Sequence, residues 1–223
     1  MLHKRYLQEK IQHDLLKKMV FIGGPRQVGK TTLARLIGHQ QYKQFSYLNW
    51  DNTENRKQII SAQFDPQTTL IIFDEIHKYK KWKNYIKGQF DNYHKRFSIL
   101  VTGSARLDLY QKGGDSLMGR YYYYRLHPFS VAEVLARPLP QLKPLTELYF
   151  PTHPQAFSKL QKLLKFGGFP EPLFSANAET LRRWHNQRME RLVKEDIRDI
   201  ENVRDLSALQ ILVELLPDRV GSQ

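Results

Sequence analysis

The sequence contains no cysteine. This absence excludes a disulfide framework, a zinc site built from thiolates and a cysteine nucleophile. The sequence also lacks an apolar run of about 18 residues, the length that a membrane-spanning helix needs. Its N-terminal stretch MLHKRYLQEKIQHDLLKK is charged where a signal peptide would have an apolar core. We therefore expect a cytoplasmic protein without a membrane span.

Acidic residues are outnumbered by basic ones. The chain has 223 residues, with 35 Lys or Arg against 22 Asp or Glu, a net charge of +13 and a pI near 9.8. Residues 1–50 alone hold nine basic and two acidic side chains. Such a balance favours partners that contain phosphate, such as a nucleotide, a nucleic acid or an anionic lipid. With 41% apolar residues the chain can bury a core, which excludes a disordered protein.

Short apolar runs, bounded by turn residues and separated by helical patterns, recur in the first part of the chain. They predict strands over Met19–Gly23, Phe45–Trp50, Leu70–Asp74, Ser98–Thr102 and Tyr121–Leu126. Strands joined by helical crossovers form a mainly parallel sheet with helices on both faces. The predicted fold is therefore α/β, with a five-stranded sheet. The run at Leu70–Asp74 begins with the wholly apolar LIIF and should be a central strand.

Proline marks the end of this α/β part. Five prolines lie between Pro138 and Pro154, a density that neither a helix nor a central strand tolerates. We expect an α/β unit over residues 1–136, a linker over 137–154, and a smaller helical, lid-like unit over 155–223. Helices are predicted near Gln155–Lys165 and over Glu179–Asn202. The apolar LSALQILVELL near the C-terminus is either a last helix docked on the body or the start of a further, truncated domain.

The segment GPRQVGKTT fits the phosphate-binding pattern G-x-x-x-x-G-K-[ST]. It follows an apolar strand and opens a helix, the context that this P-loop requires. The glycines let successive N–H groups point at phosphate oxygens. We expect Lys30 to contact the β- and γ-phosphates, Thr31 to bind Mg²⁺ and Thr32 to reach a phosphate nearer the ribose. The nucleotide-binding residues are therefore predicted to be Gly24, Pro25, Arg26, Gln27, Val28, Gly29, Lys30, Thr31 and Thr32.

Two carboxylates, Asp74 and Glu75, close the apolar strand LIIF. An aspartate at this point can hold Mg²⁺, usually through a water molecule. An adjacent glutamate can orient or deprotonate the water that attacks the γ-phosphate. We therefore predict Asp74 as a metal ligand and Glu75 as the catalytic base.

The segment SILVTGSARLDL contains another apolar strand that ends in small polar residues. The layout predicts that this strand lies between the two motif strands, which brings its end close to the phosphate site. Thr102 or Ser104 would then act as a sensor of the γ-phosphate or the attacking water, with Ser104 preferred. The alternative is a Thr-Gly-Ser turn that bonds only to its own backbone.

Five segments together resemble one known group of proteins: GPRQVGKTTL, FDEI, TGSA, SLMGR and GGFPEP. They are similar to AAA-type ATPases, specifically the bacterial and archaeal ATP-binding proteins in which a P-loop domain precedes a C-terminal domain of unknown function. The resemblance runs from about residue 5 to the end of the chain. It implies an AAA-type ATPase domain over residues 1–136 and ATP as the nucleotide; a guanine-reading N/T-K-x-D pattern is absent. It also favours the truncated-domain interpretation of LSALQILVELL.

The resemblance further implies an arginine that stabilises charge on the transferring phosphate, from the same chain or from a neighbouring subunit. Arg120, in SLMGR, is the first candidate and Arg106 competes with it. The alternative is that either arginine simply pairs with an acid such as Asp108 or Asp115.

Other functions fit single features of the sequence. Asp74-Glu75-Ile76-His77 spells a D-E-x-H box, but the residues after the α/β part are too few for the second sheet domain of a helicase. Residues 77–88 (HKYKKWKNYIKG) interleave lysines with aromatics, as nucleic-acid-binding segments do. Helical spacing of Trp82 and Tyr85 favours instead aromatics that pack on the sheet beside solvated lysines. Residues 182–194 (RRWHNQRMERLVK) have the same two interpretations.

The sequence thus predicts Mg²⁺-dependent hydrolysis of ATP to ADP and phosphate that drives a conformational change. Its catalytic residues are predicted to be Glu75, Lys30, Ser104 and Arg120, and its metal ligands Thr31 and Asp74. The alternatives are a slowly hydrolysing nucleotide switch and a DNA-binding module regulated by ATP. A small-molecule kinase is disfavoured because Glu75 suits water activation. A DNA or protein partner on the basic surface and assembly into a homo-oligomer both stay open.

Overall fold

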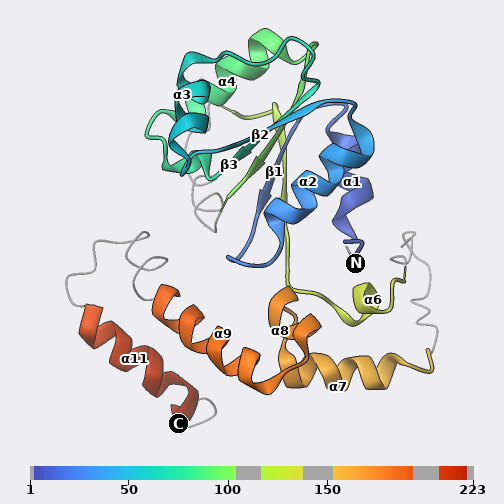
Figure 1. Ribbon diagram of the computed structural model, residues 1–223, viewed down its shortest axis with the longest axis vertical. Coiled ribbons are helices and arrows are strands. Elements are labelled where there is room, and N and C mark those ends of the chain that lie inside the picture. The colour runs from blue at the N-terminus through green and yellow to red at the C-terminus, as the bar shows by residue number, and fades with distance from the viewer. Residues whose placement is uncertain (1–2, 104–116, 138–152, 193–205, 220–223) are drawn as a thin grey trace. The chain divides into compact units, whose positions relative to one another are not determined.

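The computed structural model describes residues 3–103, 117–137, 153–192 and 206–219. By its internal contacts the chain divides into two compact units, Met1–Pro170 and Glu171–Gln223. The first unit contains the sheet (Figure 1). The proline-rich stretch over 138–152 lies outside the described residues.

Five parallel strands form the sheet, in the order β2-β3-β4-β1-β5. They are β1 (Met19–Gly23), β2 (Phe45–Asn49), β3 (Leu70–Asp74), β4 (Ser98–Thr102) and β5 (Tyr121–Arg125). The five-stranded α/β fold predicted from the sequence is confirmed, and the two differences are of one residue at the ends of β2 and β5. Strand β3 is an interior strand that is buried along its whole length, and β4 lies between β1 and β3 as expected.

Helices cover both faces of the sheet (Figure 1). One face packs against α1 (Leu7–Asp14) and α2 (Lys30–Gln41). The other face packs against α3 (Thr53–Ser61), the 3₁₀ helix η1 (Ile76–Lys78) and α4 (Trp82–Tyr93). Side chains of a strand alternate between faces, so Leu70 and Ile72 of β3 join the α1–α2 core while Ile71 and Phe73 join the other core. Asp74 therefore falls on the face that α2 covers.

The first unit also includes α6 (Val131–Val134) and α7 (Ala156–Phe166). The Ser130 side chain caps α6 and Glu133 completes a capping box. We expected a helix near Gln155–Lys165 within a separate helical unit, but α7 packs against α6. The Phe129 amide also donates to the Gly168 carbonyl at 2.7 Å. These contacts keep α7 and the following turn with the sheet unit.

The second unit contains α9 (Ala178–Arg191) and α11 (Leu206–Arg219), and α8 (Pro170–Ser175) leads into it. The Asn177 side chain caps α9 by accepting from the amides of Glu179 and Thr180 at 2.8 and 3.1 Å. The helix predicted over Glu179–Asn202 starts as expected, and residues 193–202 are outside the described part. Within the described ranges, no helix has both the length and the apolar character needed to cross a lipid bilayer.

Candidate functional site

The loop between β1 and α2 has the backbone geometry that its glycines predict. Gly24 has φ 135°, and a Cβ there would lie 2.4 Å from the Leu126 carbonyl oxygen, so no larger residue fits. Gly29 has φ 98° and forms the left-handed N-cap of α2. Because of these two glycines the loop turns tightly onto the N-terminus of α2, where amide groups and the helix dipole favour an anion.

Lys30 follows this loop as the first residue of α2 and is 7% exposed. Its ammonium donates to the carbonyls of Gly24 and Pro25, at 3.0 and 2.8 Å. The cation is therefore held over the loop at the helix N-terminus. Phosphate oxygens bound to the loop amides would face this charge directly.

Asp74, at the carboxyl end of β3, is the centre of a hydroxyl cluster. Asp74 is 4% exposed, and its carboxylate accepts from Thr31 at 2.8 Å, from Tyr47 at 2.6 Å and from Thr102. An ionised carboxylate only accepts hydrogen bonds, and each of these three hydroxyls donates to it. The predicted metal ligands Thr31 and Asp74 are brought together as an oxygen-rich pair, which fits Mg²⁺ held partly through water.

Glu75 follows Asp74 in a left-handed conformation with φ 57°. A non-glycine residue in this region is strained, and such residues cluster at functional sites. Its side chain is 22% exposed, and one carboxylate oxygen lies 3.6 Å from His77 Nε2 and 3.7 Å from Lys78 Nζ. Burial raises the pKa of the Glu75 carboxyl, Lys78 lowers it and Asp74 adds to the rise. A raised pKa makes the carboxylate a better proton acceptor.

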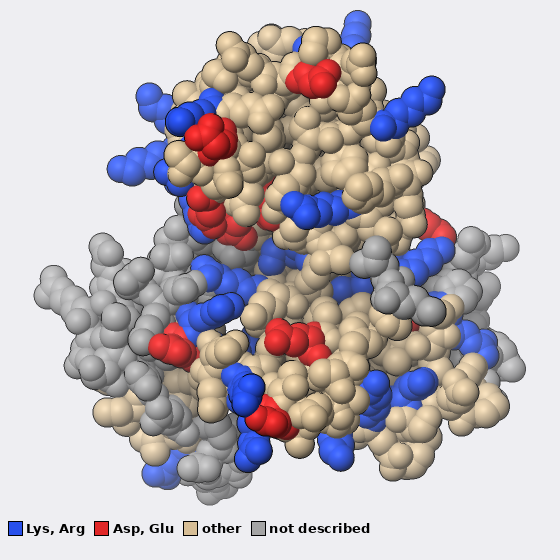
Figure 2. Space-filling view, viewed as in Figure 1, with Lys and Arg blue, Asp and Glu red and all other residues tan. Residues whose placement is uncertain are grey.

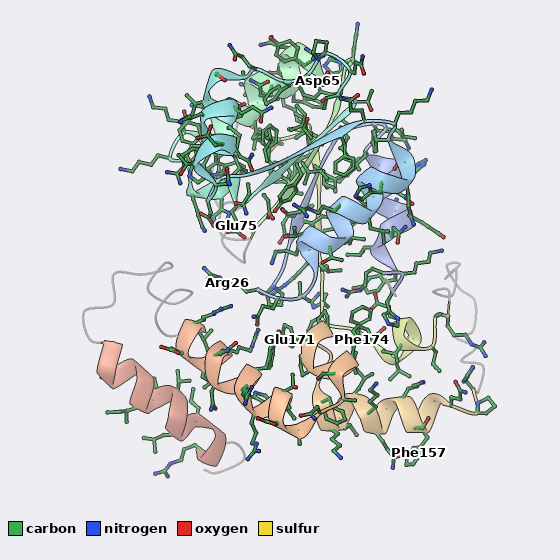
Figure 3. All side chains as sticks on the ribbon, in the orientation of Figure 1. Arg26, Asp65, Glu75, Phe157, Glu171 and Phe174 are labelled. Carbon is green, nitrogen blue, oxygen red and sulfur yellow. The ribbon has the colours of Figure 1, made fainter. Side chains whose placement is uncertain are left out.

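Figure 3 shows how Glu75 lies relative to the P-loop. Glu75 and Arg26 lie at the same edge of the sheet unit, while Asp65, which precedes β3, lies at the far edge. Because all strands are parallel, the residues that follow β1, β3 and β4 meet at this edge. Lys30, Thr31, Asp74 and Glu75 are therefore brought to one site, as the sequence predicted.

Tyr47 is a site residue that sequence reasoning missed. Its hydroxyl donates to Asp74, and Arg35 of α2 lies 3.9 Å from its ring centre. Burial raises the pKa of the Tyr47 hydroxyl, and the hydrogen bond to Asp74 raises it further. In the register of β2 and β3, Asn49 lies opposite Asp74. Tyr47 is two residues before Asn49 on β2, so its side chain lies on the same face of the sheet as Asp74. Strand alternation predicts the face on which Tyr47 lies, but the register of β2 and β3 decides that it reaches Asp74.

The two sensor candidates differ in what the structure describes. Thr102, at the end of β4, is completely buried and donates to Asp74. Ser104, the preferred candidate, lies outside the described residues, as does Arg106. The structure therefore places Thr102 in the site and provides no comparison with Ser104.

Arg120 lies at the other end of the sheet. It directly precedes β5, and its carbonyl accepts from the amide of Met19, the first residue of β1. Its guanidinium donates twice to Asp91 of α4, at 2.7 and 3.2 Å. An acidic partner was one expected alternative, although Asp108 and Asp115 are outside the described residues. Arg120 is thus not brought to the phosphate site of its own chain.

The basic aromatic stretch over residues 77–88 splits into buried rings and exposed lysines. Trp82 is 4% exposed and packs in the core, and the Tyr85 hydroxyl donates to the Ile59 carbonyl at 2.6 Å. Lys80 and Lys81 are exposed. On the face shown in Figure 2, basic side chains are interspersed with acidic ones. The rings of Trp82 and Tyr85 therefore stabilise the fold and are not a surface for stacking bases.

Comparisons with known proteins identify two regions of the chain. A family model described as an AAA domain matches residues 16–135, and one described as a domain of unknown function matches residues 157–223. An uncharacterized protein of Methanocaldococcus jannaschii is 23% identical over 213 residues, a match that covers 89% of this chain and 46% of that protein. The chain thus spans about half the length of this curated relative.

Solved structures give more distant likenesses. The RuvB Holliday junction branch migration motor of Thermotoga maritima is 18% identical, with a TM-score of 0.42; the match covers 59% of this chain and 48% of that chain. PCH-2 of C. elegans is 13% identical, with a TM-score of 0.37, and the shares covered are 59% and 44%.

Proposed function

Since this chain belongs to the AAA domain family, we propose that it binds ATP with Mg²⁺ and hydrolyses the ATP to ADP and phosphate. The observation that carries the proposal is the meeting of Lys30, Thr31 and Asp74 at one sheet edge, with Glu75 next to Asp74. The hydrolysis is proposed to drive a conformational change of the helical part.

Each side chain has a proposed task that follows from its position. The loop amides and Lys30 bind and orient the phosphates, and Thr31 and Asp74 hold the metal. When bound, Mg²⁺ supplies positive charge that neutralises the phosphate oxygens. Glu75 orients the attacking water and accepts its proton at a carboxylate oxygen. Thr102 and Tyr47 hold the Asp74 carboxylate in place, and Ser104 stays a proposed sensor.

Phosphate release from ATP by the purified chain tests this proposal. We expect turnover with Mg²⁺, loss of turnover with EDTA, and weak or no turnover of GTP under the same conditions. A chain that is folded but releases no phosphate and binds no ATP would contradict the proposal.

A slow nucleotide switch is the second candidate function. The observation in its favour is that the Glu75 carboxylate already lies near His77 and Lys78, within 3.7 Å of each. A switch would bind ATP tightly and release phosphate only over many minutes. Single-turnover measurements with excess protein distinguish it from a faster enzyme.

We propose that Arg120 acts in trans, at the phosphate site of a neighbouring copy of the chain. In its own chain Arg120 lies at the opposite end of the sheet from that site. We expect Arg120→Ala to lower turnover about 100-fold or more, as charge-stabilising arginines do. Its exposed pair with Asp91 adds little stability, so the variant should stay folded.

Mixing variants tests this prediction for Arg120. Adding inactive Glu75→Gln chains, which keep Arg120, should restore turnover by Arg120→Ala chains if the two assemble. Asp91→Asn is the matched control and should keep turnover. Full activity of Arg120→Ala alone, or no recovery on mixing, would rule out the trans role.

A DNA or protein partner and a cytoplasmic location stay predictions. The exposed lysines of the 77–88 stretch favour a phosphate-containing partner through charge alone. Stimulation of ATP turnover by DNA, weakening as salt rises, is the expected sign of such a partner.

A further inference from the structure

Arg5 is a buried charged residue with no task in the nucleotide chemistry described above. It is 4% exposed and precedes α1. Its guanidinium donates to the Glu133 carboxylate at 2.9 Å, to the Val28 carbonyl at 3.0 Å and to the His127 carbonyl at 2.5 Å. It also lies 4.0 Å from the ring centre of Phe129. Each of these hydrogen bonds joins Arg5 to a segment that is far from it in the sequence.

One of these contacts is with the P-loop itself. Val28 is fully buried and precedes Gly29, the N-cap of α2. A Cβ added to Gly29 would lie 3.7 Å from Arg5 Nη1 and 3.9 Å from Pro170 Cγ. The guanidinium therefore packs directly against the part of the P-loop that precedes Lys30. A shift of the 28–29 peptide must move the hydrogen bond to Arg5.

The other contacts lead from Arg5 to the turn Gly167–Pro170. Phe129, whose ring lies against the guanidinium, donates its amide to the Gly168 carbonyl at 2.7 Å. A Cβ on Gly168 would lie 2.7 Å from the Phe129 carbonyl oxygen, so the two backbones touch. Phe169 packs against the core that α1 and α2 share. The turn is thus attached to the P-loop through Arg5 and Phe129, and in sequence it leads into α8.

The guanidinium is suited to transmit movement. It is planar and holds several acceptors in fixed directions, and its ion pair with Glu133 is buried, with both side chains no more than 5% exposed. Glu133 is held in turn by the Tyr6 and Ser130 amides, at 3.1 and 3.2 Å. A lysine in place of Arg5 would keep the charge but could not reproduce this set of directions.

We propose that Arg5 is a positioning residue that couples nucleotide occupancy of the P-loop to the turn Gly167–Pro170. Binding of phosphate reorients the loop amides, and Arg5 passes the change from the Val28 carbonyl to His127, Phe129 and the turn. This inference rests on the nucleotide site proposed above. It identifies the contacts through which nucleotide binding at that site would affect the segment before α8.

Backbone hydrogen exchange of the full chain, with and without Mg²⁺ and ADP, tests the coupling. In the wild type we expect saturating ADP to slow exchange of the Phe129 amide and of the 167–170 turn about tenfold, a usual size for coupling between sites. In Arg5→Lys we expect ADP to bind while this slowing is lost. Arg183→Lys is the matched control, because Arg183 is an exposed arginine of α9, and it should behave as the wild type.

A second variant breaks the path at its other end. Gly168→Ala places a methyl group against the Phe129 carbonyl without touching the P-loop. Gly168→Ala should bind ADP with the wild-type affinity, but ADP should no longer slow exchange of the Phe129 amide and of the 167–170 turn. It replaces Arg5→Lys as the test variant if Arg5→Lys does not fold. Wild-type slowing in either folded variant would overturn the inference. Failure of the wild type to bind ADP would instead overturn the proposed function, and the coupling with it.

Discussion

The Glu75→Gln variant is expected to lose ATP turnover by about 100-fold or more, the usual contribution of a positioned general base. A glutamine has the same shape but cannot accept the proton of the attacking water. ATP affinity should change little, because Lys30 and the loop amides bind the phosphates in the proposed site. Phosphate release and ATP binding should both be measured on the same preparation.

Glu54→Gln is the matched control for Glu75→Gln. Glu54 is an exposed residue of α3 that pairs with Lys57 at 3.0 Å, so its loss removes a similar charge away from the site. This control should turn over ATP at the wild-type rate. Wild-type turnover by Glu75→Gln would show that Glu75 is not the catalytic base.

The Asp74→Asn variant is expected to weaken the Mg²⁺-dependent part of ATP binding by about 10- to 100-fold. Asp74 accepts from the hydroxyls of Thr31, Tyr47 and Thr102. An asparagine would turn an NH₂ donor toward at least one of these donors, which leaves a buried polar group unsatisfied. We therefore also expect the free energy of unfolding to fall by about 1–3 kcal/mol.

Titrations of ATP with and without Mg²⁺, together with chemical denaturation, check the prediction for Asp74. Asp65→Asn is the control, since Asp65 is exposed and lies at the opposite edge of the sheet unit (Figure 3). If Mg²⁺ strengthens ATP binding equally in Asp74→Asn and in the control, Asp74 does not hold the metal.

Most of the sheet was predictable because its signal is local. Each strand is a short apolar run between turn residues, and the P-loop pattern identifies the end of β1 and the start of α2. Parallel order then brings the strand ends together, which is why Lys30, Thr31 and Asp74 meet as predicted. The position of Arg120 could also be predicted, because a residue just before a strand lies at the amino-terminal end of the strands in a parallel sheet.

The remaining parts of the site depend on contacts between distant segments. Tyr47 on β2 contacts Asp74 on the neighbouring strand β3. The register that aligns the two strands cannot be predicted from the sequence of either strand alone. Arg5 contacts Val28, His127 and Glu133, and nothing in the local pattern around Arg5 indicates these partners. The left-handed conformation of Glu75 likewise arises from the turn between β3 and η1.

The most direct test of the central claim is a calorimetric titration of Mg²⁺ and ATP into the wild type and Lys30→Met. Lys30 is buried in the P-loop, and Lys57→Met, at an exposed position on α3, is the control. We predict saturable binding to the wild type and the control, and binding to Lys30→Met weaker by about tenfold or more, the cost of losing a charged hydrogen-bond donor. Equal binding by all three folded proteins, or no binding by the wild type, would contradict the account.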